Sequence, residues 1–264
     1  MRTVIFIPAR YQSSRFPGKS LAVLRGATGI AKSLIERSWD AATQVSSVAE
    51  VFVLTDDARI AEATKAFGGN VLMTPPECRN GTERCAAAVA LLSEPADIIV
   101  NLQGDAPLTP PHYVEALIDA LAEDPTIHMA TPVLKTAAEH LAKLQTDRKA
   151  GRVGATTAVF GANNDALYFS KEVLPFYDGA PQDAVSVFHH VGCYAYKPET
   201  LMHYNGLPEG PLEKREGLEQ LRFLENAIPV RCVEVESKGH DFWELNNPSD
   251  VPIIEAIMAK EGLK

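Results

Sequence analysis

Short apolar runs alternate with segments of helical periodicity through the first half of this 264-residue chain. Each run is uninterrupted and rich in β-branched residues, which is typical of a strand buried on both faces of a sheet. Strands are predicted at residues 3–7, 50–54, 70–73 and 97–102, and helices at residues 29–43, 57–67 and 81–92. A repeated strand–helix order requires right-handed crossovers in a parallel sheet. The predicted fold class is therefore α/β, with a mostly parallel sheet.

The pattern changes after residue 128. In the second half we predict strands at residues 129–134, 155–160 and 229–235, and helices at residues 137–145, 212–226 and 248–264. Asn247 is the expected N-cap of the last helix, with Pro248 at its first position. Residues 130–200 are predicted to form a smaller, partly antiparallel subdomain. No low-complexity linker interrupts the chain, so we expect residues 1–264 to fold as a single domain.

A loop with three cations follows the first predicted strand. Arg10, Arg15 and Lys19 lie on it, with Ser13 and Ser14 between them. Clustered cations repel one another unless an anion lies among them. Arginine matches phosphate oxygens in bidentate geometry, lysine adds a point charge, and serine hydroxyls can donate to the remaining oxygens. Because ligands of open α/β sheets bind where strands end, the loop is interpreted as a triphosphate site. A solvated basic loop is the alternative.

Two better-known phosphate loops do not fit this segment. Residues 18–20 read Gly-Lys-Ser, as at the end of a P-loop, but Ser13 stands where that motif needs its first glycine. The segment that follows reads as a short extended piece and a turn, whereas a P-loop helix begins at once. No G-x-G-x-x-G fingerprint follows the first strand, which argues against a dinucleotide site.

Charge and cysteine content exclude several classes of protein. The formal net charge is -9, and the basic residues are local, which argues against a nucleic-acid surface. Four cysteines contain no C-x-x-C pair, and a chain of this size needs no disulfides, so a reduced, cytoplasmic protein is expected. No apolar stretch approaches a membrane span, and no membrane insertion is predicted.

Asp105 closes the sequence Asn-Leu-Gln-Gly-Asp, which begins at the end of the fourth predicted strand. It is expected to project into the same crevice as the phosphate loop. Mg²⁺ bound to a triphosphate keeps several waters and needs only one or two protein carboxylates. Asp105 is therefore the candidate metal ligand. The structural alternative is a cap for the helix that opens near Pro110, but five residues separate the two.

The ordered set of motifs resembles the 3-deoxy-manno-octulosonate cytidylyltransferases. The resemblance extends to the end of the chain, and it rests on the loop 8–19, Met73-Thr74, residues 81–84 (Gly-Thr-Glu-Arg), 103–105 (Gln-Gly-Asp), 166–170 (Ala-Leu-Tyr-Phe-Ser), His190-x-Gly192-x-Tyr194-x-Tyr196, 211–213 (Pro-Leu-Glu) and 218–222 (Leu-Glu-Gln-Leu-Arg). Each motif is weak by itself; their order and spacing make the resemblance specific.

The resemblance implies a Rossmann-like, GT-A-like nucleotidyltransferase fold and a magnesium-dependent transfer of CMP. The nucleotide would be CTP, the acceptor the anomeric hydroxyl of an eight-carbon sugar acid, and the leaving group pyrophosphate. It also implies a homodimer, with the subdomain at residues 130–200 in sugar binding and dimerisation, and a place in lipopolysaccharide synthesis. Cations suit this chemistry, since phosphoryl-type transfer depends on positioning and charge neutralisation.

The resemblance also assigns site residues. Arg10, Ser13, Ser14, Arg15, Lys19, Thr74, Thr82, Arg84 and Gln103 would bind the nucleotide, with Thr82 and Arg84 near the cytosine. Gln103, Lys171, His190, Tyr194, Glu219 and Gln220 would surround the sugar. Arg15, Lys19 and Asp105 would be catalytic, and Lys19 the residue whose loss is most damaging. Structural alternatives are a core aromatic for Tyr194, a solvated helix face for Glu219 and a hydrogen-bonded structural histidine for His190.

The chain departs from the family pattern at the metal and at the sugar. Asn246 stands where the family has an aspartate that serves as second metal ligand. Its amide oxygen can coordinate Mg²⁺ but brings no charge, so Glu244 or Asp241 are alternatives. Thr157 replaces a family lysine, Lys171 replaces an arginine, and a second arginine is missing from residues 176–179. Because arginine and lysine grip a carboxylate differently, the acceptor could be another acidic sugar.

Two further functions stay open at this level. The departures are compatible with a nucleotide-binding homologue that has lost catalysis. A sugar-1-phosphate nucleotidyltransferase would share the fold class, but it leaves the motifs at residues 190–194 and 218–222 unexplained.

Overall fold

The structure is a computed structural model that describes residues 1–13, 15–153, 155–176 and 186–264. Its strands are β1 (Thr3–Pro8), β2 (Val23–Arg25), β3 (Ala31–Ser33), β4 (Glu50–Thr55), β5 (Asn70–Met73), β6 (Ile98–Leu102), β7 (Met129–Lys135), β8 (Thr157–Phe160), β9 (Ala166–Ser170), β10 (Phe188–His190), β11 (Cys193–Tyr196) and β12 (Arg231–Glu234). Its α-helices are α1 (Leu34–Thr43), α2 (Ala58–Ala66), α3 (Gly81–Val89), α4 (Pro111–Glu123), α5 (Ala138–Lys149), α6 (Pro198–His203), α7 (Pro211–Glu216), α8 (Leu221–Glu225) and α9 (Val251–Glu261).

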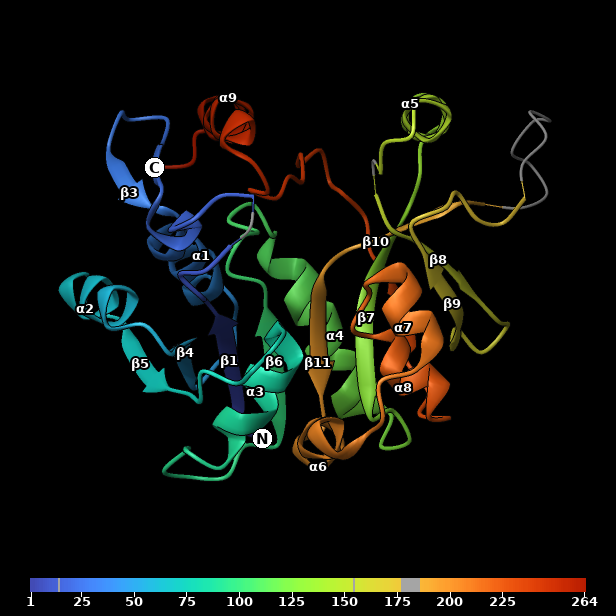
Figure 1. The fold of residues 1–264 in the computed structure, drawn as a ribbon, viewed down its shortest axis with the longest axis horizontal. Coiled ribbons are helices and arrows are strands. Elements are labelled where there is room, and N and C mark those ends of the chain that lie inside the picture. Colours follow the sequence, from blue (N-terminus) through green and yellow to red (C-terminus); the bar gives the residue numbers. More distant parts are fainter. Residues whose placement is uncertain (14, 154, 177–185) are drawn as a thin grey trace.

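One large sheet crosses the molecule (Figure 1). Its strand order in the described residues is β5-β4-β1-β6-β11-β7-β10-β8-β9, with β12 beside β7. The strands β5, β4, β1 and β6 are parallel, whereas β11, β10 and β9 run antiparallel to their neighbours. The α/β class with a parallel half and a partly antiparallel half is confirmed. The second half continues the same sheet because β11 pairs with β6.

The sheet is buried on both faces, as the apolar runs predict. Ile5 and Ile7 of β1 pack in a cluster with residues of α1 and α4, while Val4 and Phe6 face a second cluster that includes α3, α6 and α8. Successive side chains of a strand point to opposite faces, so an uninterrupted apolar run fills both cores. No helix in the described ranges is long and apolar enough to cross a membrane.

Two predicted helices differ most from the structure. The predicted helix 29–43 begins only at Leu34, because residues 31–33 form β3 and pair with β2; Ser33 then caps α1 by accepting from the N–H of Glu36. The predicted helix 212–226 is divided into α7 and α8. Gly217 adopts a left-handed conformation (φ 63°) and ends α7, so residues 218–220 form a turn.

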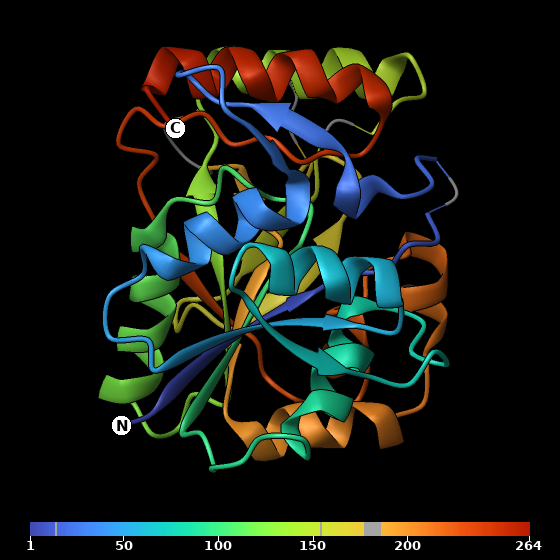
Figure 2. The same ribbon diagram turned by 90° about the vertical axis from the view of Figure 1, so that its left-hand side faces the viewer.

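The chain's last segment returns to the carboxyl ends of the parallel strands. The N–H of Leu245 donates to the carbonyl of Asp105 at 2.8 Å. Leu245 also belongs to a small apolar cluster that joins α9 to β2 and α1, and Figure 2 shows α9 in red lying across the top of the molecule, with the β2–β3 hairpin beneath it. Asn247 caps a 3₁₀ turn, Pro248–Asp250, through a capping box with Asp250. The helix proper begins at Val251 instead of Pro248.

Candidate active site

A cavity of about 940 Å³ opens where the parallel strands end. Its walls come from the loop after β1, the start of α3, the loop after β6, the strands β10 and β11, the turn between α7 and α8, and residues 242–250. The predicted site residues that line it are Arg10, Ser13, Arg15, Lys19, Arg84, Gln103, Asp105, Lys171, His190, Tyr194, Glu219, Gln220 and Asn246. The fold thus brings together residues as far apart in the sequence as Pro8 and Asp250.

The phosphate loop is closed on itself by a hydrogen bond from the N–H of Gly18 to the carbonyl of Tyr11 at 2.9 Å. Gly18 has φ 72°, and a Cβ added there would lie 3.2 Å from the Tyr11 ring, so the position favours glycine. The guanidinium of Arg59 covers that ring at 3.3 Å from its centroid. These contacts join the start of the loop at Tyr11 to its end at Gly18.

Two cations of the loop bond to the predicted metal ligands. Lys19 Nζ lies 2.6 Å from Asp105 Oδ2, and Arg15 Nη2 donates to Asn246 Oδ1 at 2.8 Å. Neither contact could be inferred from spacing, because the partners are 86 and 231 residues apart. Positive groups for phosphate and oxygen donors for a cation thus lie beside one another in one wall of the cavity.

Glu244 is a carboxylate two residues before Asn246, the position at which the family has an aspartate. It lines the cavity, its Oε2 accepts from Asn246 Nδ2 at 3.4 Å, and a Cβ on Gly192 would lie 3.3 Å from its Oε1. Burial, and then the charge of Asp105, raise the pKa of Glu244 to about 7. Asp241 lies elsewhere: it is outside this lining and pairs with Lys260 at 2.6 Å. Of the three residues considered for the second metal ligand, Asn246 and Glu244 line the cavity and Asp241 does not.

The residues assigned to the cytosine end form a buried set behind the cavity wall. Arg84 is 4 % exposed; its Nη1 donates to Thr74 Oγ1 at 2.5 Å and its Nη2 pairs with Asp56 at 3.0 Å. Thr74 and Thr82 do not line the cavity, and the N–H of Thr82 donates to Glu219 Oε2 at 3.0 Å. Only Arg84 of the three reaches the cavity surface.

The sugar-end residues are held by side-chain hydrogen bonds. His190 Nε2 lies 2.9 Å from Thr131 Oγ1, and burial lowers the pKa of this imidazole to about 3, so it is neutral. Tyr194 Oη donates to Gln220 Oε1 at 3.2 Å. Gln220 is 2 % exposed, and its Nε2 has no hydrogen-bond partner among the described residues. An unpaired buried donor in a cavity wall is available to a ligand oxygen.

Glu219 does not lie on a solvated helix face, which corrects that structural alternative. It lies in the turn after α7 because Gly217 ends the helix. Burial raises the pKa of its carboxyl. Lys171 Nζ lies over this turn, since a Cβ on Gly217 would be 3.1 Å from it. Ser14 and residues 177–179, which the sequence analysis singled out, lie outside the described residues.

Several lining residues had no sequence signal of their own, among them Cys78, Arg79, His140, His189, Phe242 and Trp243. His140 of α5 stacks on His189 of β10 with ring centroids 6.0 Å apart, and His189 meets Phe242 edge-on at 6.3 Å. These contacts join three separate segments, and spacing along the chain cannot foresee them.

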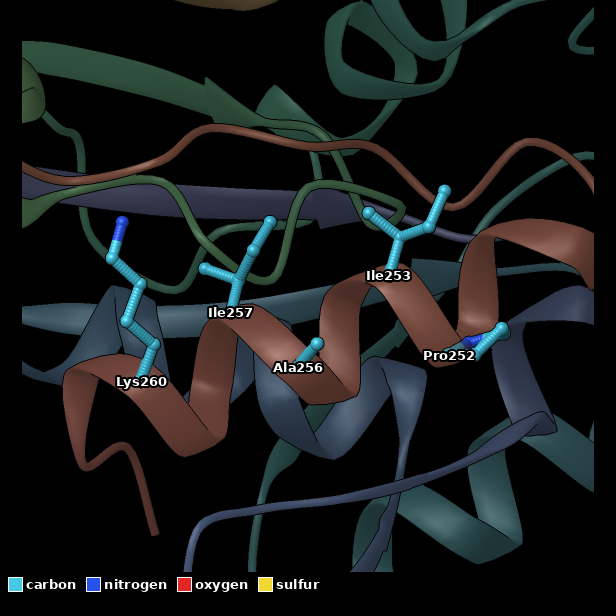
Figure 3. Close-up of a pocket in the computed structure, with 5 residues that line it drawn as sticks. All are labelled: Pro252, Ile253, Ala256, Ile257 and Lys260. Carbon is cyan, nitrogen blue, oxygen red and sulfur yellow. The ribbon is translucent and has the colours of Figure 1, made fainter.

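A second hollow, of about 440 Å³, lies on α9 and is lined by Pro252, Ile253, Ala256, Ile257 and Lys260 (Figure 3). Its lining is apolar apart from one lysine and holds none of the predicted site residues. The large cavity is therefore the candidate active site.

Known proteins are similar to this chain in both sequence and fold. A family model described as Cytidylyltransferase matches residues 4–234. A 3-deoxy-manno-octulosonate cytidylyltransferase of Maricaulis maris (strain MCS10) is 44 % identical over 99 % of both chains, and that of Escherichia coli is 37 % identical over 98 % of this chain and 97 % of its own. The chain belongs to the 3-deoxy-manno-octulosonate cytidylyltransferase family.

Solved structures agree with this membership. A structure described as CMP:2-keto-3-deoxy-manno-octonic acid synthetase complexed with CTP superposes with a TM-score of 0.85 at 35 % identity, covering 99 % of this chain and 100 % of that one. A cytidylyltransferase of Leptospira borgpetersenii has a TM-score of 0.60 at 16 % identity, covering 97 % of this chain and 86 % of its own; it shows the fold alone. The resemblance seen in the motifs and the nucleotidyltransferase fold are confirmed, and the chain is a cytidylyltransferase.

Proposed function

We propose that this protein transfers CMP from CTP to the anomeric hydroxyl of 3-deoxy-manno-octulosonate and releases pyrophosphate. The observation that carries the proposal is the single cavity whose walls hold the phosphate loop, Gln103 to Asp105, and the His190, Tyr194 and Glu219–Gln220 groups. Full-length relatives named for this reaction, and a neighbour in complex with CTP, support it.

The chain's own cations account for the phosphate chemistry. In the transfer, the sugar oxygen bonds to the α-phosphorus, the bond to the pyrophosphate oxygen breaks, and the hydroxyl proton is released. Negative charge grows on the leaving pyrophosphate, and preorganised positive groups lower the barrier most where that charge develops. Lys19 is held by Asp105 and Arg15 by Asn246 before any phosphate arrives. When CTP binds, its phosphate oxygens would compete with Asp105 and Asn246 for these two cations.

The donor set also fits a magnesium ion. Asp105, Glu244 and the amide oxygen of Asn246 converge on one wall, and oxygen donors are what Mg²⁺ prefers. Among the described residues, no three His, Cys, Asp or Glu side chains lie close enough together to hold a metal ion by themselves. The ion would therefore keep waters and phosphate oxygens in its coordination shell. We assign Asp105 and Asn246 as its ligands, with Glu244 supplying the charge that Asn246 lacks. When bound, the ion would neutralise phosphate charge.

We propose that the acceptor sugar binds at the part of the cavity wall that holds His190 and Gln220. Gln220 Nε2, His190 and Lys171 line it, and they offer donors and a cation to the hydroxyls and carboxylate of a sugar acid. Thr157 cannot take the part of the family lysine, because its buried hydroxyl donates to the carbonyl of Glu172 at 2.7 Å and accepts from Leu174 at 3.2 Å. A related sugar acid therefore remains the second candidate acceptor.

We also propose a homodimer and a cytoplasmic location. Leu167 and Phe176, in the subdomain, are 69 % and 88 % exposed, and a homodimer through residues 130–200 would cover them. Light scattering of the purified protein tests this. All four cysteines are free thiols, which suits a cytoplasmic enzyme of lipopolysaccharide synthesis, with no nucleic-acid partner.

The reaction is tested by mixing purified protein with CTP, Mg²⁺ and 3-deoxy-manno-octulosonate and measuring pyrophosphate. Release that depends on both substrates is expected. If no pyrophosphate is released with this sugar but a related sugar acid is turned over, the assigned acceptor would change to that sugar acid. Binding of CTP without turnover of any acidic sugar would favour a homologue that has lost catalysis, and turnover of a sugar 1-phosphate would contradict the proposal.

A further inference from the structure

Three of the family-like motifs contain charged residues that do not line the cavity. These residues are Glu83 after Thr82, Glu213 at the start of α7, and Arg222 after the turn that carries Glu219 and Gln220. Their side chains meet in the core although the residues come from segments up to 139 positions apart. The proposed reaction assigns them no task.

Arg222 is the centre of this group. It is 2 % exposed, and its Nε and Nη2 each donate to the Glu213 carboxylate at 2.7 Å, a bidentate pair. Its Nη1 donates to Glu83 Oε1 at 3.2 Å, and its guanidinium lies 4.2 Å from the centroid of the Tyr204 ring. All three nitrogens of the guanidinium thus donate to a carboxylate, and one face lies over the Tyr204 ring. Only arginine has donors in this fork geometry, and lysine could serve one carboxylate at a time.

The group contacts the turn 218–220 and the helices next to it. Arg222 is two residues beyond Gln220, and its N–H donates to the carbonyl of Glu219 at 3.3 Å. The Tyr204 hydroxyl, beneath the guanidinium, donates to the same carbonyl at 3.1 Å. Glu213 anchors the helix before the turn, and Glu83 anchors the start of α3, whose Thr82 N–H holds the Glu219 carboxylate at 3.0 Å.

We propose that Arg222 is a positioning residue, which through Glu213, Glu83 and Tyr204 fixes the turn that presents Glu219 and Gln220 to the acceptor sugar. The inference rests on the proposed function. Buried ion pairs in general contribute little net stability. The inference therefore gives these pairs a different task, which is to position the turn. The turn sets the orientation of two side chains. These are Gln220, whose Nε2 has no hydrogen-bond partner among the described residues, and Glu219, whose Oε1 accepts from Gln103 Nε2 at 3.5 Å.

Steady-state kinetics of Arg222→Lys test the inference, because this variant keeps the charge and loses the fork. A rise of at least tenfold in the KM for the sugar acid is expected, with a CTP dissociation constant, measured by calorimetry, within twofold of wild type. The matched control is Arg37→Lys, which is equally buried (3 % exposed) but binds backbone carbonyls beside β2 and β3. It should leave the KM for the sugar unchanged.

The outcomes separate the two proposals. If wild type shows no turnover, the proposed function fails. A second outcome is that wild type is active and Arg222→Lys lowers the melting temperature but leaves the sugar KM unchanged, the behaviour expected of Arg37→Lys. Arg222 is then merely structural, and the inference is overturned. An equal rise in the sugar KM and the CTP dissociation constant would also overturn it. Glu213→Gln, which removes the bidentate pair from the other side, must repeat the sugar-specific rise.

Discussion

Lys19 and Asp105 show how single residues combine two tasks. Each was expected from its own motif, the lysine for phosphate and the aspartate for a metal, and the structure adds that their charges compensate each other at 2.6 Å. The carboxylate of Asp105 holds the ammonium of Lys19 in position and compensates its charge. Since a phosphate would compete for the same ammonium, the pair is expected to rearrange when the triphosphate binds.

Replacing Lys19 by Met should lower kcat/KM about 10² to 10³-fold, the usual effect of losing one group that stabilises charge in the transition state. Pyrophosphate release is the measurement. Lys32→Met is a matched control, because Lys32 also pairs with an aspartate, Asp40, at 2.6 Å but lies outside the cavity. Equal losses in both variants would show that the effect comes from a broken ion pair alone.

Asn246→Asp should lower the Mg²⁺ concentration needed for half-maximal activity, because a carboxylate adds the charge that the amide lacks. Activity is titrated against Mg²⁺ at saturating CTP. Asp105→Asn, in the same assay, should abolish activity. If Asn246→Asp left the requirement unchanged or raised it, the assignment of residue 246 as a metal ligand would be wrong.

At the scale of elements, the break between α7 and α8 matters most. Periodicity predicts one continuous helix through residues 212–226, and it fails because Gly217 is left-handed and the following three residues turn inward. The same break places Glu219 and Gln220 in the cavity wall. Sequence periodicity can locate the apolar residues of both helices, but it cannot distinguish a helical glycine from one that ends a helix.

Gly217→Ala should destabilise the protein by about 1 kcal/mol, because an alanine disfavours φ 63°. Its Cβ would also lie 3.1 Å from Lys171 Nζ. Urea unfolding measures the change. Gly206→Ala is the control, since a Cβ there meets open space and φ lies outside the left-handed region. A change at Gly217 no larger than at Gly206 would contradict the argument.

At the scale of the whole molecule, neutral histidines buried between β7, β8 and the cavity connect pH to stability. Burial lowers the pKa of His190 to about 3 and that of His189 to about 4. The unfolded chain, with an ordinary pKa near 6.5, binds more protons below that pH. The contribution of these two histidines to stability is therefore fully present above pH 6.5 and is lost as the pH decreases toward their folded-state pKa values.

Between pH 8 and pH 5, His190 alone should account for ~2 kcal/mol of lost stability. Urea unfolding of His190→Gln at both pH values should show a pH dependence smaller by that amount, whatever the variant's absolute stability. His203→Gln, which removes an exposed histidine, is the control. An unchanged pH dependence in His190→Gln would mean that this imidazole is not buried as a neutral group.

Ligand binding to the whole fold gives a direct test of nucleotide choice. CTP should raise the melting temperature more than UTP, GTP or ATP do, because a ligand stabilises the folded state in proportion to its affinity and concentration. Equal concentrations of all four, with Mg²⁺, make the comparison fair. A greater shift with a purine nucleotide would contradict the assignment of the base.

The sequence by itself determined the parallel half of the sheet, the phosphate loop and the family, since apolar periodicity and ordered motifs are local signals. Only the tertiary structure decided which groups meet. It paired Lys19 with Asp105 and Arg15 with Asn246, brought Glu244 into the cavity, left Asp241 outside it, and joined Glu83, Glu213 and Arg222 in the core. These contacts depend on how sheet twist, helix breaks and the returning C-terminal segment place distant residues, which no spacing along the chain encodes.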